Sequence, residues 1–229
     1  GDIEVDIPTP SAGDVIGLID GVIETVTGED EPISTNSVAA PQDEAVDDAE
    51  ITTETTTEAY DIVLDLIASG EGNYDSMNRG RGGDTSAEEA VSRLGKKLTE
   101  MTVKEILQFQ ASGDLYAAGR YQIIPQTMPG AIQYAGVNLD EQFSEELQDR
   151  LAIGLIAGKR PHLDKYLRGE HNDLQGAMIA LAKEWASFPD PRTGRSFHHG
   201  TGNNRSSHSV EQVSATLIAA RNQIMSANS

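Results

Sequence analysis

Residues 68–74, ASGEGNY, directly follow the apolar run YDIVLDLI and place one carboxylate, Glu71, between two glycines. The spacing of the apolar residues predicts a helix over about residues 57–71, and glycine is the residue that most often ends a helix. Glu71 would then lie at the negative end of the helix dipole, which disfavours its ionised form, and partial burial would also raise its pKa. A carboxylic acid that stays protonated near neutral pH suits general acid catalysis of glycosidic cleavage. Taken alone, the stretch is more typical of an exposed loop glutamate.

Composition excludes several classes of protein. The 229 residues contain no cysteine, which excludes a disulfide framework, a thiolate zinc site and a cysteine nucleophile. No apolar run approaches the roughly 20 residues of a membrane span. Of the 37 acidic residues, 20 lie in residues 1–78, which contain no Lys or Arg, and the remaining 17 are balanced by 17 basic residues. The chain therefore has no basic field for nucleic acid.

The chain divides by composition near residue 57. Residues 27–59 are acidic, rich in Thr, Ser and Pro, and free of aromatic residues, so they cannot bury enough apolar area to offset the entropy of ordering. Apolar residues at helical spacing in 12–27 suggest either a short amphipathic helix that docks on a partner or a weakly ordered tail. We expect residues 1–56 to be an acidic, low-complexity tail and residues 57–229 to be one mostly helical domain.

Capping signals predict the remaining helices. Thr55 with Glu58 has the form of a capping box, as does Thr102 with Glu105, and Gly113 stops the second of these helices. Further helices are predicted in 144–159, 172–188 and 209–225. Residues 118–125, AGRYQIIP, are the best candidate for a strand, and residues 72–98 for loops or a small hairpin.

Four motifs occur in one order: SGEG around Glu71, GRYQ at 119–122, Gln148-Asp149 in a helix, and WASFP at 185–189. In this respect the chain resembles the lysozyme-like peptidoglycan-cleaving enzymes, above all the phage-lambda-type lysozymes, which act as lytic transglycosylases, and related phage and bacterial muramidases. The resemblance covers about residues 60–225. It implies a mostly α (α+β) fold, with a helical domain, a small β-containing lobe and a cleft for the glycan.

The resemblance also implies roles for individual residues. Glu71 would be the catalytic acid that protonates the oxygen of the MurNAc-GlcNAc β-1,4 bond. Tyr121 and Gln122 would line the cleft, since an amide can bond sugar substituents and an aromatic ring can pack on a sugar. Asn73 and Tyr74 follow the acid and are candidates for sugar contact or for loop structure. Trp185 either lines the cleft or packs in the core.

A hydrolase of this kind uses a second carboxylate, about 5–9.5 Å from the first. Asp75 and Asp84 are the candidates, and we prefer Asp84, which lies in the Gly-rich segment NRGRGGDTS. If neither reaches the sugar, a single Glu can serve as acid and then as base in a lytic transglycosylase. The sequence leaves both outcomes open.

No cofactor and no metal are expected, because acid-assisted glycoside cleavage needs neither, and the histidines at 198, 199 and 208 have no ligand spacing. The expected partner is the peptidoglycan glycan strand, in the bacterial periplasm or cell wall. A second hypothesis is a virion, tail or secretion-spike component. Residues 1–30 would then bind a larger assembly, and the domain would serve mainly as a glycan-binding module.

Overall fold

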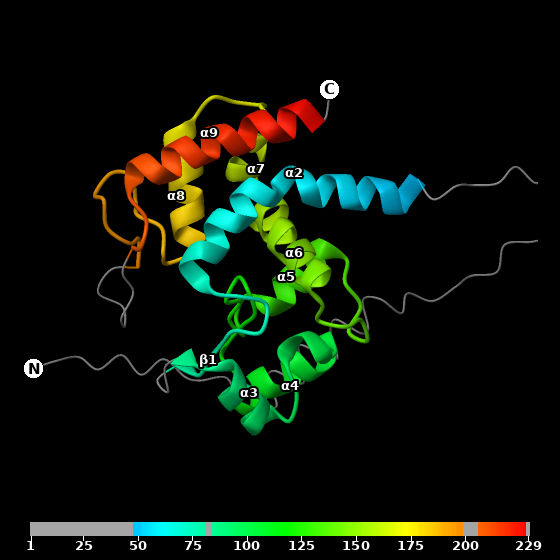
Figure 1. The fold of residues 1–229 in the computed structure, drawn as a ribbon. Helices are drawn as coiled ribbons and strands as arrows, with labels where there is room; N and C mark the ends of the chain where they lie inside the picture. Colours follow the sequence, from blue (N-terminus) through cyan, green and yellow to red (C-terminus); the bar gives the residue numbers. More distant parts are fainter. Residues whose placement is uncertain (1–47, 81–83, 199–205, 228–229) are drawn as a thin grey trace, which may run out of the picture. The chain divides into compact units, whose positions relative to one another are not determined.

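The computed structural model describes residues 48–80, 84–198 and 206–227 (Figure 1). Contacts along the chain separate residues 1–47 from a compact unit of residues 48–229. The helix expected in 12–27 and the partner-binding segment expected in 1–30 lie outside the described residues. The first described helix, α2 (Asp48–Glu71), begins nine residues before the boundary expected at residue 57. Thr55 and Glu58 therefore lie inside a helix, and the capping box predicted there was wrong.

The elements follow one another with short connections. The helices after α2 are α3 (Ala87–Leu94), η2 (Leu98–Glu100), α4 (Val103–Ser112), α5 (Met128–Ala135), α6 (Glu145–Gly154), η3 (Leu155–Lys159), α7 (Pro161–Leu167), α8 (Leu174–Glu184) and α9 (Val210–Ala227); the strands are β1 (Met77–Asn78), β2 (Asp84–Thr85) and β3 (Ala117–Ala118). This confirms the expected class, a mostly helical domain with a small β-containing lobe.

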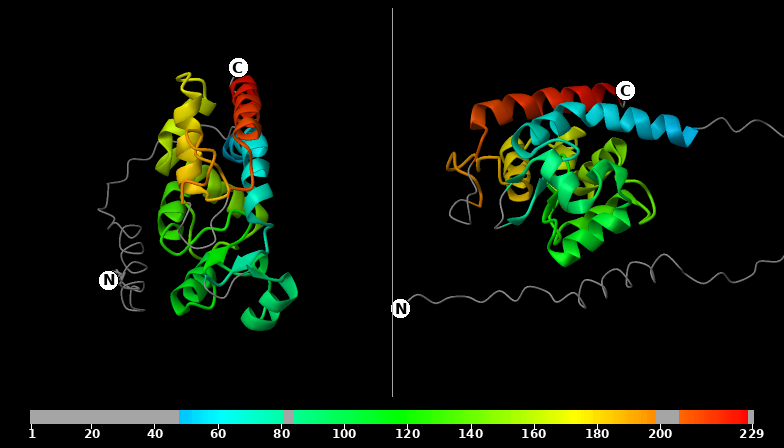
Figure 2. Two further views of the ribbon diagram at one scale, coloured as in Figure 1. Left: turned by 90° about the vertical axis from the view of Figure 1, so that its left-hand side faces the viewer. Right: turned by 60° about the horizontal axis from the view of Figure 1, so that its bottom comes forward.

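The core of the unit is a helical layer in which α2 and α9 run side by side (Figures 1 and 2). Leu64 and Ile67 of α2 and Leu217 and Ala220 of α9 are all buried, as a helix with one apolar face requires. Helix α6 packs against α2 and α5, and α7 packs against both α8 and α9. The C-terminal turn of α2, where Glu71 lies, is thereby held by tertiary packing.

Several helix ends match the capping signals in the sequence. At the start of α4, the Thr102 hydroxyl accepts from the backbone N–H of Glu105, and the Glu105 side chain accepts from the backbone N–H of Thr102. Gly113 ends α4 in the left-handed conformation. The hydroxyl of Ser144 accepts from the backbone N–H of Leu147 at the start of α6, and the hydroxyl of Ser209 accepts from the backbone N–H of Gln212 at the start of α9. Such caps satisfy N–H groups that a helix leaves without partners.

The small lobe is a three-stranded antiparallel sheet with the order β2-β1-β3. Met77 of β1 pairs with Thr85 on one side and with Ala118 on the other. Helices α3 and α4 lie beside this sheet in Figure 1. The lobe is built from residues 72–98, as expected for a hairpin there, together with Ala117–Ala118.

Residues 118–125 do not form the predicted strand. Only Ala117–Ala118 is extended, because Gly119 (φ +76°) and Gln122 (φ +47°) both adopt left-handed backbone conformations. Ala118 and Ile123 form an antiparallel bridge, so the chain turns back on itself at 119–122. Left-handed conformations are unfavourable for residues other than glycine, and they cluster at functional sites.

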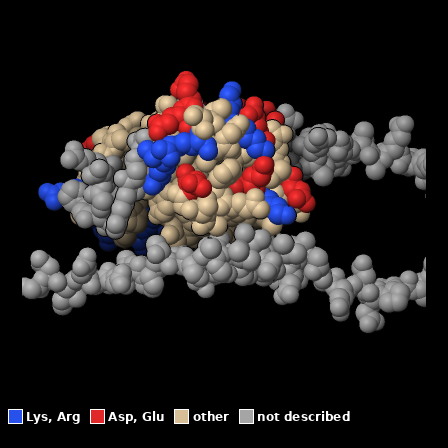
Figure 3. Space-filling view, turned by 90° about the horizontal axis from the view of Figure 1, so that it is seen from below, with Lys and Arg blue, Asp and Glu red and all other residues tan. Residues whose placement is uncertain are grey.

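Acidic and basic side chains are mixed on the face of the described unit seen in Figure 3. This mixture agrees with the equal numbers of acidic and basic residues after residue 78. Across residues 48–80, 84–198 and 206–227, none of the helices has the length and apolar character that a membrane crossing requires.

Candidate active site

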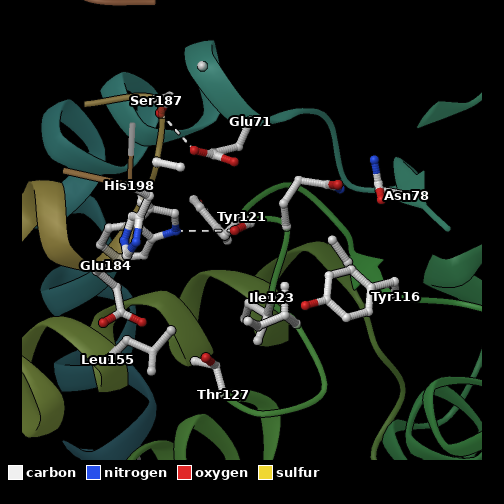
Figure 4. Close-up of a pocket in the computed structure, with 16 residues that line it drawn as sticks. Glu71, Asn78, Tyr116, Tyr121, Ile123, Thr127, Leu155, Glu184, Ser187 and His198 are labelled. Atoms are coloured by element: carbon white, nitrogen blue, oxygen red, sulfur yellow. Dashed lines mark hydrogen bonds between the residues drawn. The ribbon is translucent and has the colours of Figure 1, made fainter. Parts of the chain in front are cut away.

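A cleft of about 540 Å³ opens at the C-terminal end of α2 (Figure 4). One side is formed by the end of α2 and the segment after α8, and the other by residues around β1, β3 and the start of α5. The residues that line it are Gly70, Glu71, Asn78, Tyr116, Ala117, Tyr121, Gln122, Ile123, Ile124, Thr127, Leu155, Glu184, Trp185, Ala186, Ser187 and His198. Three of the stretches singled out in the sequence therefore meet in one cavity.

Glu71 is the last residue of α2, and its carboxylate points into the cleft (Figure 4). The side chain is half-buried, and its Oε1 accepts a hydrogen bond of 2.7 Å from the Ser187 hydroxyl. Burial raises the pKa of Glu71 to about 7, although hydrogen bonds from the side chain and backbone of Ser187 oppose the rise by stabilising the carboxylate. The carboxyl group is thus partly protonated near neutral pH, which a general acid requires.

The two glycines around Glu71 are explained by close packing. A Cβ at Gly70 would lie 2.5 Å from His208 Cε1 and 2.6 Å from Ser187 Oγ. Any residue other than glycine at position 70 would therefore keep His208 and Ser187 farther from α2. A Cβ at Gly72 would lie 2.8 Å from Ser76. The glycine on each side of the acid therefore lets a neighbouring segment pack against the end of the helix.

Tyr121 and Gln122 both line the cleft. The amide of Gln122 donates to the carbonyls of Gly119 (2.8 Å) and Ser76 (3.3 Å), which ties the turn at 119–122 to the segment after α2. The Tyr121 side chain is buried, and its hydroxyl donates to Asp149. Burial and this carboxylate raise the pKa of Tyr121, so the phenol stays neutral.

Gln148 and Asp149 of α6 hold the GRYQ turn in place. Gln148 is buried; its Oε1 accepts from the backbone N–H of Arg120, and its amide donates to the carbonyl of Tyr74. Asp149 accepts from the hydroxyls of both Tyr74 and Tyr121. This network links two cleft segments to one helix, and it accounts for the Gln-Asp pair in the sequence.

Trp185 serves both of the roles considered for it. The side chain lines the cleft, yet it is 4% exposed and packs in the core. Its indole N–H donates to the carbonyl of Tyr121 at 3.1 Å, which joins the end of α8 to the GRYQ turn.

Asn73 and Tyr74 are not among the residues that line the cleft. The side chain of Asn73 accepts from the backbone N–H of Asp75 and forms a local turn, while the hydroxyl of Tyr74 is bound to Asp149. The Arg120 guanidinium lies over the Tyr74 ring, 5.0 Å from its centroid. This placement favours loop structure and bracing over the sugar contact predicted for both residues.

The candidates for a second carboxylate differ in where they lie relative to the cleft. Asp75 accepts from the backbone and hydroxyl of Thr99 and does not line the cleft. Asp84 lies in β2, where the register pairs it with Asn78, a cleft residue; its side chain lies outside the described part of the structure. Glu184 lines the cleft, but its side chain is 4% exposed and paired with both Lys159 and Arg160.

Sequence reasoning missed several residues of the opposite wall. Tyr116 and Thr127 both line the cleft across from Glu71 (Figure 4). Neither hydroxyl has a hydrogen-bond partner among the described residues, and Thr127 makes no capping bond at the start of α5. Tyr116 immediately precedes the AAGRYQ stretch, which is the one local signal that pointed to it. Ser187 was part of the WASFP motif, but its bond to Glu71 spans 116 positions of the chain.

No group of three or more His, Cys, Asp or Glu side chains that could hold a metal ion occurs among residues 48–80, 84–198 and 206–227. The arrangement that the described cleft offers is a half-buried carboxylic acid facing hydroxyl and amide groups.

Comparison with known families agrees with this geometry. A model of the family described as Endolysin matches residues 61–217, about two thirds of the chain. The chain belongs to the endolysin family. It is therefore a phage-type peptidoglycan-cleaving enzyme with a lysozyme-like fold. No curated protein and no solved structure matched the chain. The endolysin match begins in the middle of α2, ten residues before Glu71, and it includes every residue that lines the cleft.

Proposed function

We propose that the protein cleaves the MurNAc-GlcNAc β-1,4 bond of peptidoglycan, with Glu71 as the general acid. The observation that carries the proposal is the carboxyl group of Glu71, which points into the cleft and has a pKa of about 7 because it is buried. In its acid form Glu71 donates its proton to the bridging oxygen as the bond from that oxygen to the anomeric carbon breaks. The Ser187 hydroxyl stabilises the carboxylate that this transfer leaves.

We favour a lytic transglycosylase over a hydrolase. The carboxylates that line the described part of the cleft are Glu71 and Glu184, and Glu184 is neutralised by Lys159 and Arg160. The Glu71 carboxylate would then accept the proton of the substrate's own 6-hydroxyl as this oxygen attacks the anomeric carbon. That step closes a 1,6-anhydro ring and restores the acid form of Glu71. Asp84 remains the rival, because a carboxylate opposite Asn78 would support attack by water.

The first experiment replaces Glu71 by Gln, which is nearly the same size but has no acidic proton to transfer. We expect release of muropeptides from purified walls to fall to background, while the fold and glycan binding persist. Binding can be followed by fluorescence, since Trp185 is the single tryptophan and lines the cleft. Glu58→Gln is the matched control, because Glu58 is an exposed residue of the same helix outside the cleft. Wild-type activity in Glu71→Gln would refute the assignment.

The second experiment identifies the product and tests Asp84. Mass spectrometry of muropeptides from the wild-type enzyme should find 1,6-anhydro ends, and Asp84→Asn should retain most of the activity. Reducing ends, together with a loss of about 100-fold or more in Asp84→Asn, would establish hydrolysis with Asp84 as the second carboxylate. Asp140→Asn is the control, since Asp140 is exposed and does not line the cleft.

Association with a phage particle or secretion spike stays a hypothesis about residues 1–30. The compact unit that begins at Asp48 sets the truncation that tests it, since a cut at residue 56 would remove part of α2. We expect residues 48–229 to cleave purified walls as the full chain does. Loss of binding to a particle, with activity retained, would support a separate role for the removed segment.

A further inference from the structure

His208 lies directly behind the general acid but does not line the cleft. It precedes α9 and is 8% exposed. Its ring stacks on that of Phe188, with 4.8 Å between centroids and 15° between planes. The cleavage reaction described above gives this buried histidine no role.

The polar contacts of His208 join the two segments that flank Glu71. On one side, Nε2 lies 2.9 Å from the hydroxyl of Ser69, in the last turn of α2 and two residues before the acid. On the other side, Nδ1 lies 3.2 Å from the backbone carbonyl of Ser187. The same carbonyl accepts from the backbone N–H of Ser207 at 2.9 Å. Ser187 in turn donates to Glu71, so the imidazole is connected to the residue that holds the acid through Ser207.

One tautomer of the imidazole satisfies its hydrogen bonds to Ser69 and Ser207. The Ser69 hydroxyl donates to the carbonyl of Leu66 at 2.7 Å, so it can only accept from His208, which assigns the ring proton to Nε2. Nδ1 then accepts from the Ser207 hydroxyl at 3.2 Å and does not donate to the Ser187 carbonyl, which is bound instead by the backbone N–H of Ser207. The ring is thus fixed by hydrogen bonds at both nitrogens and by stacking on one face.

Gly70 shows how closely this ring packs. A Cβ at Gly70 would lie 2.5 Å from His208 Cε1, so the ring edge fills the place where a side chain would begin. The glycine before the acid and the histidine before α9 therefore form one packed unit, although 138 positions separate them in the sequence.

We infer that His208 is a positioning residue for the general acid: through Ser207 and the stacked Phe188 it fixes the Ser187 segment against the last turn of α2, so that the Ser187 hydroxyl holds Glu71. The inference rests on the proposed role of Glu71. It makes His208 act on catalysis through Ser187 and not through contact with the substrate.

The test replaces His208 by Phe, which keeps the ring and its stacking on Phe188 but removes both polar contacts. We expect kcat on purified walls to fall about tenfold, because a group displaced by a fraction of an ångström loses part of its orientation. KM and glycan binding, read from Trp185 fluorescence, should stay within about twofold, since His208 touches no substrate. The falling limb of the pH profile should move to higher pH, because a weaker bond from Ser187 stabilises the Glu71 carboxylate less.

A double-mutant cycle separates positioning from simple stability. If His208 acts through Ser187, the double variant His208→Phe/Ser187→Ala should have the kcat and pH profile of Ser187→Ala alone. Ser69→Ala removes one of the contacts without changing the ring, and it should shift both quantities in the same direction, but less. His162→Phe is the control for the loss of a histidine, since His162 is half exposed on α7 and outside the cleft.

Two results would overturn the inference: a folded His208→Phe enzyme with wild-type kcat and pH profile, or effects of His208→Phe and Ser187→Ala that multiply independently. If His208→Phe does not fold, wild-type kcat and pH profile in Ser69→Ala overturn it. None of these outcomes would affect the proposed function, which fails only if Glu71→Gln remains active.

Discussion

Replacing Gly70 by Ala should stabilise the helix locally and yet impair the enzyme. Alanine is favoured over glycine within a helix by about 0.5–1 kcal/mol. The new Cβ, however, would lie 2.6 Å from Ser187 Oγ, whereas ordinary contact begins at 3.4 Å. Ser187 must therefore move by about 0.8 Å, the difference between these distances. A shift of that size away from α2 lengthens the 2.7 Å bond to Glu71 beyond the range of an O–H···O hydrogen bond.

The expected loss follows from this displacement. Misplacing a group by about 1 Å can cost about 100-fold in rate, so we expect kcat of Gly70→Ala to fall by about 10- to 100-fold. The assay is release of muropeptides from purified walls over a range of enzyme and substrate concentrations, with Trp185 fluorescence as a separate measure of binding.

Gly130→Ala is the matched control, because Gly130 lies within α5 and its Cβ would meet nothing closer than Tyr134 at 3.8 Å. This variant should gain stability, with no change in kcat. Wild-type kcat in Gly70→Ala would show that the packing of Ser187 against α2 does not control the acid, and it would refute the reasoning.

Three further predictions concern the ionisation of Glu71. Ser187→Ala removes a donor that stabilises the carboxylate, so the pKa of Glu71 should rise and the falling limb of the pH–activity profile should move to higher pH; an unchanged or lower limb would contradict this. Folding raises the pKa of Glu71 from 4.5 to about 7, so the stability that the protonated side chain contributes is fully present below pH 4.5 and is lost as the pH rises through 7. As the pH rises from 4.5 to 7, the free energy of unfolding of Glu71→Gln, measured with urea, should therefore increase by about 3 kcal/mol relative to that of the wild type. A difference between the two proteins that does not change with pH would refute this prediction. Because burial is the largest cause of the raised pKa, the falling limb should hardly move between low and high salt; a marked shift would indicate a nearby charge such as that of Asp84.

Local signals in the sequence were sufficient for much of the fold. The capping residues Thr102, Ser144 and Ser209 act over three or four positions, so the sequence alone located the starts of their helices. The same kind of signal failed at Thr55, because α2 begins at Asp48 and Thr55 lies within the helix. It could not anticipate the turn at 119–122 either, because Gln122 has a positive φ, which residues other than glycine rarely adopt.

The sequence alone pointed to Glu71 as the central residue of the candidate site, but it did not identify the residues that Glu71 contacts. Glu71 between two glycines was visible in the sequence, as were Tyr121 and Gln122, which line the same cleft. The partner of Glu71 was not, because its bond to Ser187 spans 116 positions. Tyr74 lies three residues after the acid, and yet its hydroxyl donates to Asp149, 75 positions away in the sequence.

The setting of the acid is therefore a product of tertiary packing between the first and last described helices. Helix α2 carries Glu71 at its end, and α9 runs beside it and begins just after His208 (Figure 2). The apolar contact of these two helices brings His208, two residues before α9, against Gly70, and Ser187 packs against the same glycine. Burial raises the pKa of Glu71, and no local sequence around this residue can bury the carboxyl group alone. It follows that changes in the α2–α9 contact, far from the cleft, act on the same proton as changes in Ser187.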